Sequence, residues 1–262
     1  MASFTNFATL SYNGGTTNSN IVTGEILEAL TAVKTAVSAN YSAGDRITYA
    51  LSLVNTGTAA ITDYTVTDNL GGYTVGANTV YPLAYDTGTV RYYINGVLQT
   101  APTVTAGPPL TVTGLTVPAG GSAVLIYETT ATPVAPLATG SSITNTATIT
   151  GGGLTTPITA QATVETANSA DLTISKALSP TTVTENGRIT YTFVISNTGN
   201  TEATATGNVV VTDTFAPILR SIAVTYNGTA WTEGTNYTYN AATGVFTTLA
   251  GQITVPAATF TQ

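Results

Sequence analysis

The chain contains one sequence unit twice, and this repeat constrains the fold more than any other feature. "GDRITYALSLVNTG" at residues 44–57 returns as "NGRITYTFVISNTG" at residues 186–199. "GLTVPA" at residues 114–119 returns as "GQITVPA" at residues 251–257. Matches that keep the same order over such a length indicate two copies of one domain rather than chance similarity between Thr-rich segments.

Each copy has the pattern of a β-protein. Apolar and polar residues alternate, and Asn-Gly, Thr-Gly and Pro positions interrupt the alternation as turns do. Val, Ile, Thr and Tyr, which favour strands, are frequent. We therefore expect an all-β fold of two tandem Ig-like β-sandwiches. The stretch "TGEILEALTAV" at residues 23–33 fits a helix or a strand.

The composition excludes several function classes. The chain has no Cys and no His, so it has no disulfides, no thiolate and no imidazole base. Only 7% of its residues are charged and its formal net charge is −7, which argues against a nucleic-acid partner. The carboxylates show no calcium-loop spacing, and no apolar run reaches the ~20 residues of a membrane helix. We expect a structural protein rather than an enzyme, with no metal, no cofactor and no membrane span.

This Thr-rich and Asn-rich, charge-poor composition resembles that of extracellular bacterial fibre and adhesin proteins. We expect the protein on the cell or spore surface. Two export routes stay open, because the first residues contain neither a basic nor an apolar signal region. Either a signal precedes the sequence, or the protein is released when a mother cell lyses.

The second copy is shorter than the first. The first continues after "TVPA" through "SAVLIYETTATP" and "SSITNTATIT", whereas few residues follow the second "TVPA". The missing part has a counterpart at the front of the chain, because residues 5–26 align with residues 144–166. A sandwich without its last strands exposes core side chains and unpaired backbone groups, which favours the addition of a strand.

These observations predict three segments. Residues 1–27 are a donor hairpin, residues 28–167 are the first sandwich, and residues 168–262 are a second sandwich without its final strands. We expect the hairpin to complete the second sandwich of another subunit, with Phe4, Ala8 and Leu10 as its core contacts. Donor and acceptor are different surfaces, so this contact is head-to-tail and builds a homopolymeric filament. The alternative is a stalk segment of a longer multi-repeat adhesin, in which the same hairpin finishes a preceding domain.

Polar residues fall on the core-facing side of several expected strands. Lysine occurs only twice, at the repeat-equivalent positions Lys34 and Lys176. Residues i and i+2 of a strand face the same way, so both lysines should face the core. The same rule places further polar residues inside: Asp68, Asp213, Asn145 and Asn6. Because a buried unpaired charge is costly, Lys, Asp and Asn should meet within each sandwich.

The ordered motifs resemble a known family. "TVTDNL", "VVTDTF", "VNTGT", "SNTGN" and "TNTATIT" resemble the DUF11 repeat domain of bacterial and archaeal surface proteins, over nearly all of residues 28–262. This resemblance implies an extracellular Ig-like stalk module without enzymatic activity.

The Lys-Asp-Asn trio also resembles that of the Ig-like domains of Gram-positive pilins and adhesins that form isopeptide bonds. The resemblance implies a bond from Lys34 to Asn145 within the chain, assisted by Asp68. It likewise implies a bond from Lys176 to Asn6 between subunits, assisted by Asp213. Two alternatives involve no covalent bond. One is a hydrogen-bonded cluster, and the other is a pair of lysines whose stems are buried while their ammonium groups reach water.

Overall fold

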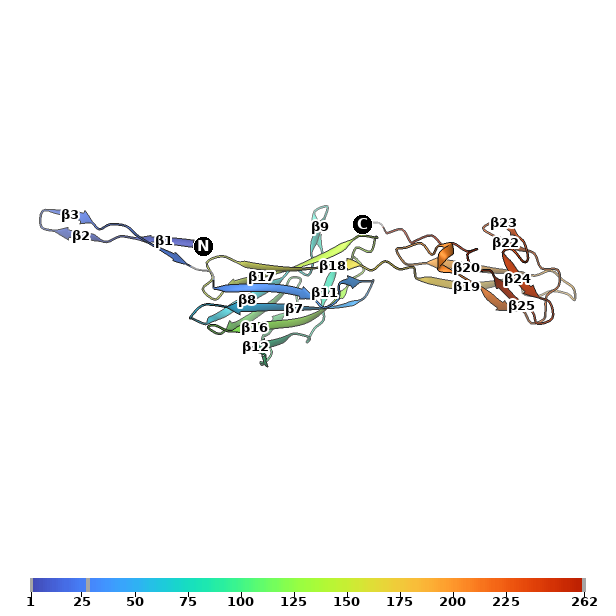
Figure 1. Ribbon diagram of the computed structural model, residues 1–262, viewed down its shortest axis with the longest axis horizontal. Helices are drawn as coiled ribbons and strands as arrows, with labels where there is room; N and C mark the ends of the chain where they lie inside the picture. The colour runs from blue at the N-terminus through green and yellow to red at the C-terminus, as the bar shows by residue number, and fades with distance from the viewer. Residues whose placement is uncertain (1, 27–28, 261–262) are drawn as a thin grey trace. The chain divides into compact units, whose positions relative to one another are not determined.

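The computed structural model describes residues 2–26 and 29–260, in two compact units, Met1–Thr166 and Ala167–Gln262 (Figure 1). The fold is all-β, as the alternating pattern predicts. Among the described residues the only helical element is one short 3-10 turn, η1 (Ala205–Gly207). In the same ranges no helix has the length and apolarity needed to cross a membrane. The boundary expected between residues 27 and 28 lies outside the described residues.

The first unit contains an Ig-like β-sandwich made of two sheets. The strand order of one sheet is β13-β12-β16-β7-β5, with β11 also paired to β16. Its strands are β5 (Leu30–Ala36), β7 (Arg46–Asn55), β11 (Leu83–Tyr85), β12 (Arg91–Ile94), β13 (Val97–Leu98) and β16 (Ser122–Ala131). The order of the other sheet is β14-β15-β8-β17-β18-β6. Its strands are β6 (Asn40–Tyr41), β8 (Ile61–Asp68), β14 (Thr103–Thr105), β15 (Leu110–Val117), β17 (Ser142–Gly151) and β18 (Ile158–Thr166).

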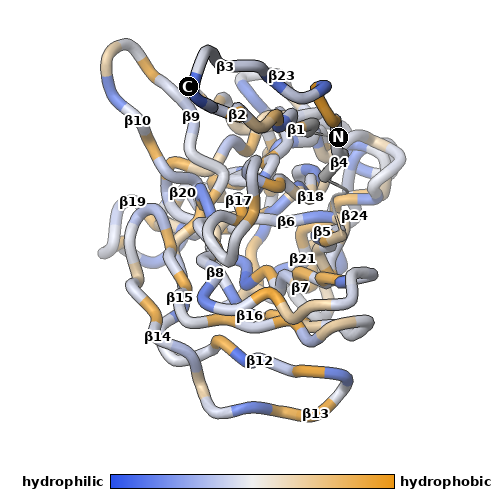
Figure 2. The backbone as a smooth tube through the Cα atoms, turned by 90° about the vertical axis from the view of Figure 1, so that its left-hand side faces the viewer, coloured by the Kyte–Doolittle hydropathy of each residue, from blue (hydrophilic) through white to orange (hydrophobic). Residues whose placement is uncertain are grey.

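The core of this sandwich lies between the two sheets. Alternate residues of β7 and β16 face inward and are buried. Figure 2 shows apolar and polar residues interspersed along the backbone. Tyr49 on β7 stacks on Tyr127 of β16 with ring centroids 5.8 Å apart. Burying one such large side chain stabilises the fold by about 1.5–3 kcal/mol. The face of each strand that carries the large apolar side chains, at every second residue, is therefore the face that packs against the other sheet. A separate hairpin, β9 (Tyr73–Val75) and β10 (Asn78–Val80), extends from this unit.

The described residues before the sandwich form one long hairpin. β1 (Ala2–Asn6) pairs with β4 (Val22–Ile26), and β2 (Thr9–Tyr12) pairs with β3 (Gly15–Asn18). Among the described residues these four strands pair only with one another. The stretch 23–33, which fits a helix or a strand by sequence, lies in the strands β4 and β5 except for residues 27–29. Residues 27 and 28 are not described, and Ala29 belongs to neither strand.

The second unit is built from smaller sheets. β19 (Leu172–Ser179) pairs with β20 (Thr190–Asn197), and β22 (Val224–Tyr226) pairs with β23 (Thr229–Trp231). A third sheet has the order β21 (Thr212–Thr214), β25 (Val245–Thr248), β24 (Tyr237–Asn240). In the first unit β7 pairs with β5 on one side and with β16 on the other. Its counterpart β20 pairs only with β19 among residues 167–260, so its second edge is open.

An equivalent asparagine closes a turn in both units. Asn55 is 1% exposed, and its Nδ2 donates to the carbonyls of Ala59 (2.8 Å) and Pro118 (3.0 Å). Its Oδ1 accepts from the backbone N–H of Gly57 at 2.9 Å. In the second unit Asn197 donates to the Thr201 carbonyl at 2.7 Å and accepts from Gly199 N–H at 2.9 Å. The repeat therefore preserves a specific hydrogen-bond network as well as a pattern.

Replacing Asn55 by Ala should destabilise the first sandwich. The substitution leaves buried backbone groups without partners, so we expect the free energy of unfolding to fall by about 2 kcal/mol. Ser52→Ala, at an exposed position of the same strand, is the matched control and should change it by less than about 0.5 kcal/mol. Urea unfolding of both variants measures the difference, and equal effects would contradict the assigned role of Asn55.

Candidate cross-linking site and acceptor groove

A lysine and an aspartate meet in the core of the first sandwich. Lys34 on β5 has a side chain that is 0% exposed, and its Nζ lies 2.5 Å from Oδ2 of Asp68 on β8. Asp68 Oδ2 also accepts a hydrogen bond from the Tyr127 hydroxyl, and its Oδ1 accepts from Leu70 N–H at 2.9 Å. The structure thus brings Lys34 and Asp68 together from opposite sheets, and each carboxylate oxygen is hydrogen-bonded.

Burial changes the proton affinity of this cluster. Desolvation lowers the pKa of Lys34 from 10.5 to about 8, although the neighbouring Asp68 carboxylate acts in the opposite direction. Burial, and secondly the negative charge of Asp68, raise the pKa of Tyr127 well above its usual value. A lysine with a lowered pKa has a larger fraction of neutral amine near pH 7, and the neutral amine is the nucleophilic form.

The carboxamide of Asn145 lies in the same part of the core. Asn145 on β17 is 0% exposed and lies two residues from Ala147, which pairs with Asp68. It adjoins the hydroxyls of Tyr49 and Tyr127 and lowers the pKa of both phenols against the larger raising effect of burial. Neither its Nδ2 nor its Oδ1 has a hydrogen-bond partner of normal geometry. A buried amide left in this state costs about 1–3 kcal/mol per group, so it requires an explanation.

The two tyrosines connect these residues. The Lys34 Nζ lies 4.8 Å from the ring centroid of Tyr49 and 5.8 Å from that of Tyr127. Lysine, aspartate and asparagine therefore gather around the same pair of aromatic rings. Neither tyrosine is among the residues predicted from the sequence. Their inward parity beside Leu51 and Leu125 is a signal that could have identified them as core residues.

The second unit repeats the ion pair in an open setting. Lys176 Nζ lies 2.6 Å from Asp213 Oδ2, but the lysine side chain is 41% exposed. Its Nζ also lies 4.7 Å from the ring centroid of Tyr191 and 5.4 Å from that of Phe215. The expected burial of Lys176 is thus only partial in the single chain. No strand among residues 167–260 corresponds to β17, which carries the asparagine in the first unit.

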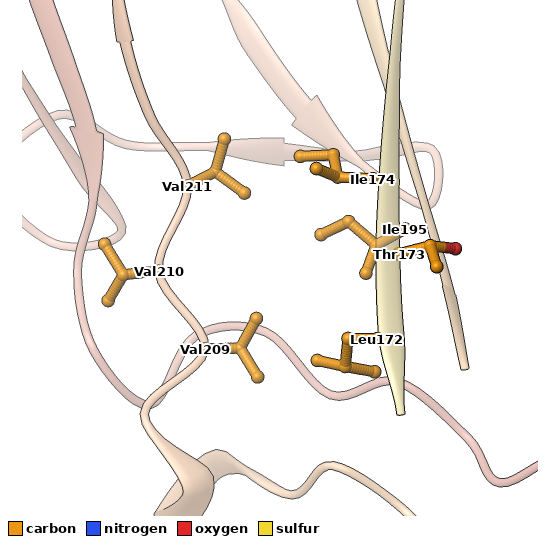
Figure 3. Close-up of a pocket in the computed structure, with 7 residues that line it drawn as sticks. All are labelled: Leu172, Thr173, Ile174, Ile195, Val209, Val210 and Val211. Atoms are coloured by element: carbon orange, nitrogen blue, oxygen red, sulfur yellow. The ribbon is translucent and has the colours of Figure 1, made fainter. Parts of the chain in front are cut away.

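An apolar groove of about 180 Å³ in the second unit is lined by residues of β19 and β20 and by residues 209–211. In Figure 3 the side chains of Val209 and Val211 point toward Leu172, Ile174 and Ile195, whereas Val210 and Thr173 point away. The first-unit equivalents of Leu172, Ile195 and Val211 are buried: Leu30 is 3% exposed, Leu53 1% and Val66 1%. In that unit β17 pairs with β8 and β18 packs on β5. The groove therefore corresponds to the place of β17 and β18.

The remaining predicted residues lie on the N-terminal hairpin. Phe4 is 55% exposed and Leu10 63%, and Ala8 and Asn6 are also exposed. Asn6 pairs with Val22 across the hairpin. The bond from Lys34 to Asn145 and the bond from Lys176 to Asn6 both remain predictions. In the described part of the chain no cluster of three or more acidic residues is arranged to hold a metal ion.

Comparisons with known proteins give a distant resemblance only. No family model matches the sequence, so the DUF11 resemblance is not shown by one, and no curated protein matches. A variant of the major pilin subunit of Bacillus cereus is 14% identical, covering 96% of this chain and 64% of the pilin, with a TM-score of 0.42. The pilus backbone of Streptococcus pneumoniae is 15% identical over 46% of this chain and 31% of that protein, with a TM-score of 0.37. A family 123 glycoside hydrolase from Clostridium perfringens is 9% identical over 53% of this chain and 27% of the enzyme, with a TM-score of 0.34. The chain spans less than two thirds of the length of each.

The lowered pKa of Lys34 predicts a pH dependence of stability. Between about pH 8 and 10.5 the unfolded chain binds a proton that the folded chain does not, so the free energy of unfolding should rise with pH. One proton gives at most about 1.4 kcal/mol per pH unit. The measurement is urea unfolding at pH 8 to 9.5 of Asn145→Ala, in which no bond to Asn145 can form. Adding Lys34→Met should remove this slope, and an unchanged slope would show that Lys34 does not titrate in this range.

Proposed function

We propose that this chain is the structural subunit of an extracellular bacterial filament. The hairpin of residues 2–26 of one copy adds to the second unit of the next copy and takes the place that β17 and β18 have in the first unit. The composition supports this function, because a charge-poor chain without His or Cys offers little to a catalytic site. The only chemical role of Asp68 and Asp213 is to assist the cross-links, within one copy for Asp68 and between copies for Asp213.

The observation that carries the proposal is the register of the hairpin. In the first unit β17 pairs with β18 so that Thr144 faces Thr163 and Asn145 faces Ala162. In the hairpin β1 pairs with β4 so that the aligned residue Thr5 faces Thr23 and Asn6 faces Val22. The register of β1 with β4 is therefore that of the aligned parts of β17 and β18, although only the latter pair belongs to a complete sandwich. Farther along the hairpin, β2 and β3 pair one residue out of this register, with Leu10 facing Thr17. The register of a strand pair determines which of its side chains face inward and which face outward.

The aligned positions give the register of the contact between copies. Ala147 and Ile149 of β17 face Asp68 and Val66 of β8. Transferred to the aligned residues, Ala8 of one copy faces Asp213 of the next, and Leu10 faces Val211. Leu10 then fills the groove beside Leu172 and Ile195. Backbone hydrogen bonds from the added strand pair the free edge of β21. The hairpin supplies no counterpart of β16, so the second edge of β20 stays open.

Covalent closure of the cluster follows from the same arrangement. A proton passes from the Lys34 ammonium to Asp68, which leaves a neutral amine and a carboxylic acid. The amine attacks Cγ of Asn145, and the acid protonates Nδ2. The proton that Nζ loses on becoming an amide passes through Asp68 to the departing nitrogen, so the Cγ–Nδ2 bond breaks and ammonia leaves as ammonium. The product is an amide bond between Nζ and Cγ, and Asp68 recovers its charge. Lys176, Asp213 and Asn6 of the incoming hairpin carry out the same step between copies.

Assembly should depend on the inward side of the hairpin. Leu10→Asp places an unpaired carboxylate in the apolar groove, so we expect the critical concentration for filament formation to rise about a hundredfold or more. Ser11→Asp adds the same charge at the next residue, on the opposite side, and should leave assembly nearly unchanged. Sedimentation and negative-stain electron microscopy of the full chain measure both. A wild-type chain that stays monomeric at high concentration would refute the filament and favour the stalk segment.

Intact-mass spectrometry tests the cross-links. A chain with the Lys34–Asn145 bond is lighter by one ammonia, because the reaction releases it, and Lys34→Ala or Asn145→Ala should restore the full mass. Filaments boiled in SDS should give a ladder, since the Lys176–Asn6 bond survives denaturation. Asn6→Ala should abolish the ladder while filaments still form, whereas Asn13→Ala, in the turn of the hairpin, should keep it. An undiminished wild-type mass means that the cluster is held by hydrogen bonds alone.

A further inference from the structure

The hairpin carries an aromatic residue over a glycine. Phe4 on β1 faces Gly24 on β4. A Cβ atom at Gly24 would lie only 2.4 Å from Cζ and 2.6 Å from Cε1 of Phe4, so the ring lies directly over the glycine. Only a residue without a side chain leaves this space free. The ring is nevertheless 55% exposed in the single chain.

The equivalent pair in the first unit has a different composition and a similar total size. The shared register places Ile143 and Val164 where the hairpin has Phe4 and Gly24. Ile143 is 2% exposed and Val164 is 0% exposed, so both belong to the core. Phe and Gly together have the same number of side-chain carbon atoms as Ile and Val together. One ring over a glycine can therefore replace two aliphatic side chains that share the space equally.

The acceptor has an aromatic cluster at the corresponding place, and its Phe215 is 7% exposed in the single chain. In the first unit a Cβ at Gly71 would lie 2.5 Å from Ile143 Cγ2, so Ile143 packs against the backbone just after Leu70. The motifs "VTDNLGG" and "VTDTFAP" align Leu70 with Phe215. The Phe215 ring lies 4.9 Å from that of Tyr191, in a cluster of aromatic residues. An incoming ring at the position of Ile143 thus meets aromatic rings, with which offset or tilted packing is favourable.

We propose that Phe4, held across Gly24, is the anchor by which the hairpin recognises the second unit of another copy, next to Phe215. This inference rests on the proposed function. It adds that Phe4 and Gly24 determine how well the hairpin fits the second unit of another copy. The glycine positions the ring before docking, so less side-chain freedom is lost on binding. The first unit does not accept this hairpin, because its own Ile143 and Val164 already fill the corresponding place.

The test is a set of four full-length chains: wild type, Phe4→Ile, Gly24→Val and the double variant Phe4→Ile/Gly24→Val. Phe4→Ile leaves a void over Gly24, and Gly24→Val displaces the ring, so each should raise the critical concentration for assembly about tenfold. The double variant recreates the pair of the first unit and should return to within about threefold of wild type, since total volume is restored. Thr5→Ile/Thr23→Val, at the outward-facing pair, is the control and should assemble like wild type.

The outcomes separate the anchor from the filament itself. If Leu10→Asp prevents assembly while Phe4→Ile and Gly24→Val assemble like wild type, the anchor is refuted and the filament stands. If the double variant assembles no better than the single variants, the two pairs do not fill the same space and the anchor is also refuted. If no chain assembles, the proposed function fails. Thermal unfolding of each chain verifies that the first sandwich is intact.

Discussion

The buried ion pair between Lys34 and Asp68 is the interaction on which the first sandwich depends. An ammonium group in an apolar interior costs several kcal/mol unless an acceptor faces it closely. The pair therefore requires β5 of one sheet and β8 of the other to keep Nζ and Oδ2 at 2.5 Å. Tyr127 donates to the same carboxylate oxygen from β16, so three strands converge on one group. The partnerless Asn145 on β17 adds a fourth strand to this centre.

The second unit contains the same pair without its covering strands. Lys176 keeps its aspartate at 2.6 Å and its aromatic neighbours, yet its side chain is 41% exposed instead of 0%. Because the residues of the pair are the same, the difference in exposure reflects the strands around them. In the first unit β16, β17 and β18 cover this side, and residues 167–260 have no counterparts of these strands.

Sequence reasoning succeeded where structure depends on neighbouring residues of one strand. The two-residue period predicted that Lys34, Asp68 and Asn145 face the core, and it predicted the all-β fold. It left residues 23–33 open, because "EILEAL" satisfies helical and strand patterns alike. The contact of Tyr127 with Asp68 and the position of Phe4 over Gly24 were not predicted. Both depend on the register between strands far apart in the sequence, which a single sequence does not determine.

In the proposed filament, the hairpin and the groove are the two halves of one interface. The hairpin exposes Phe4 and Leu10, and the groove exposes Ile174 at 57%. Exposed apolar surface and unpaired strand edges cost free energy in the single chain, and this cost is recovered only when both are covered. Each copy carries one hairpin and one groove on different surfaces, so covering the groove of one copy leaves its own hairpin available to another. A head-to-tail contact of this kind can be repeated from copy to copy, so it favours a linear assembly over a closed dimer.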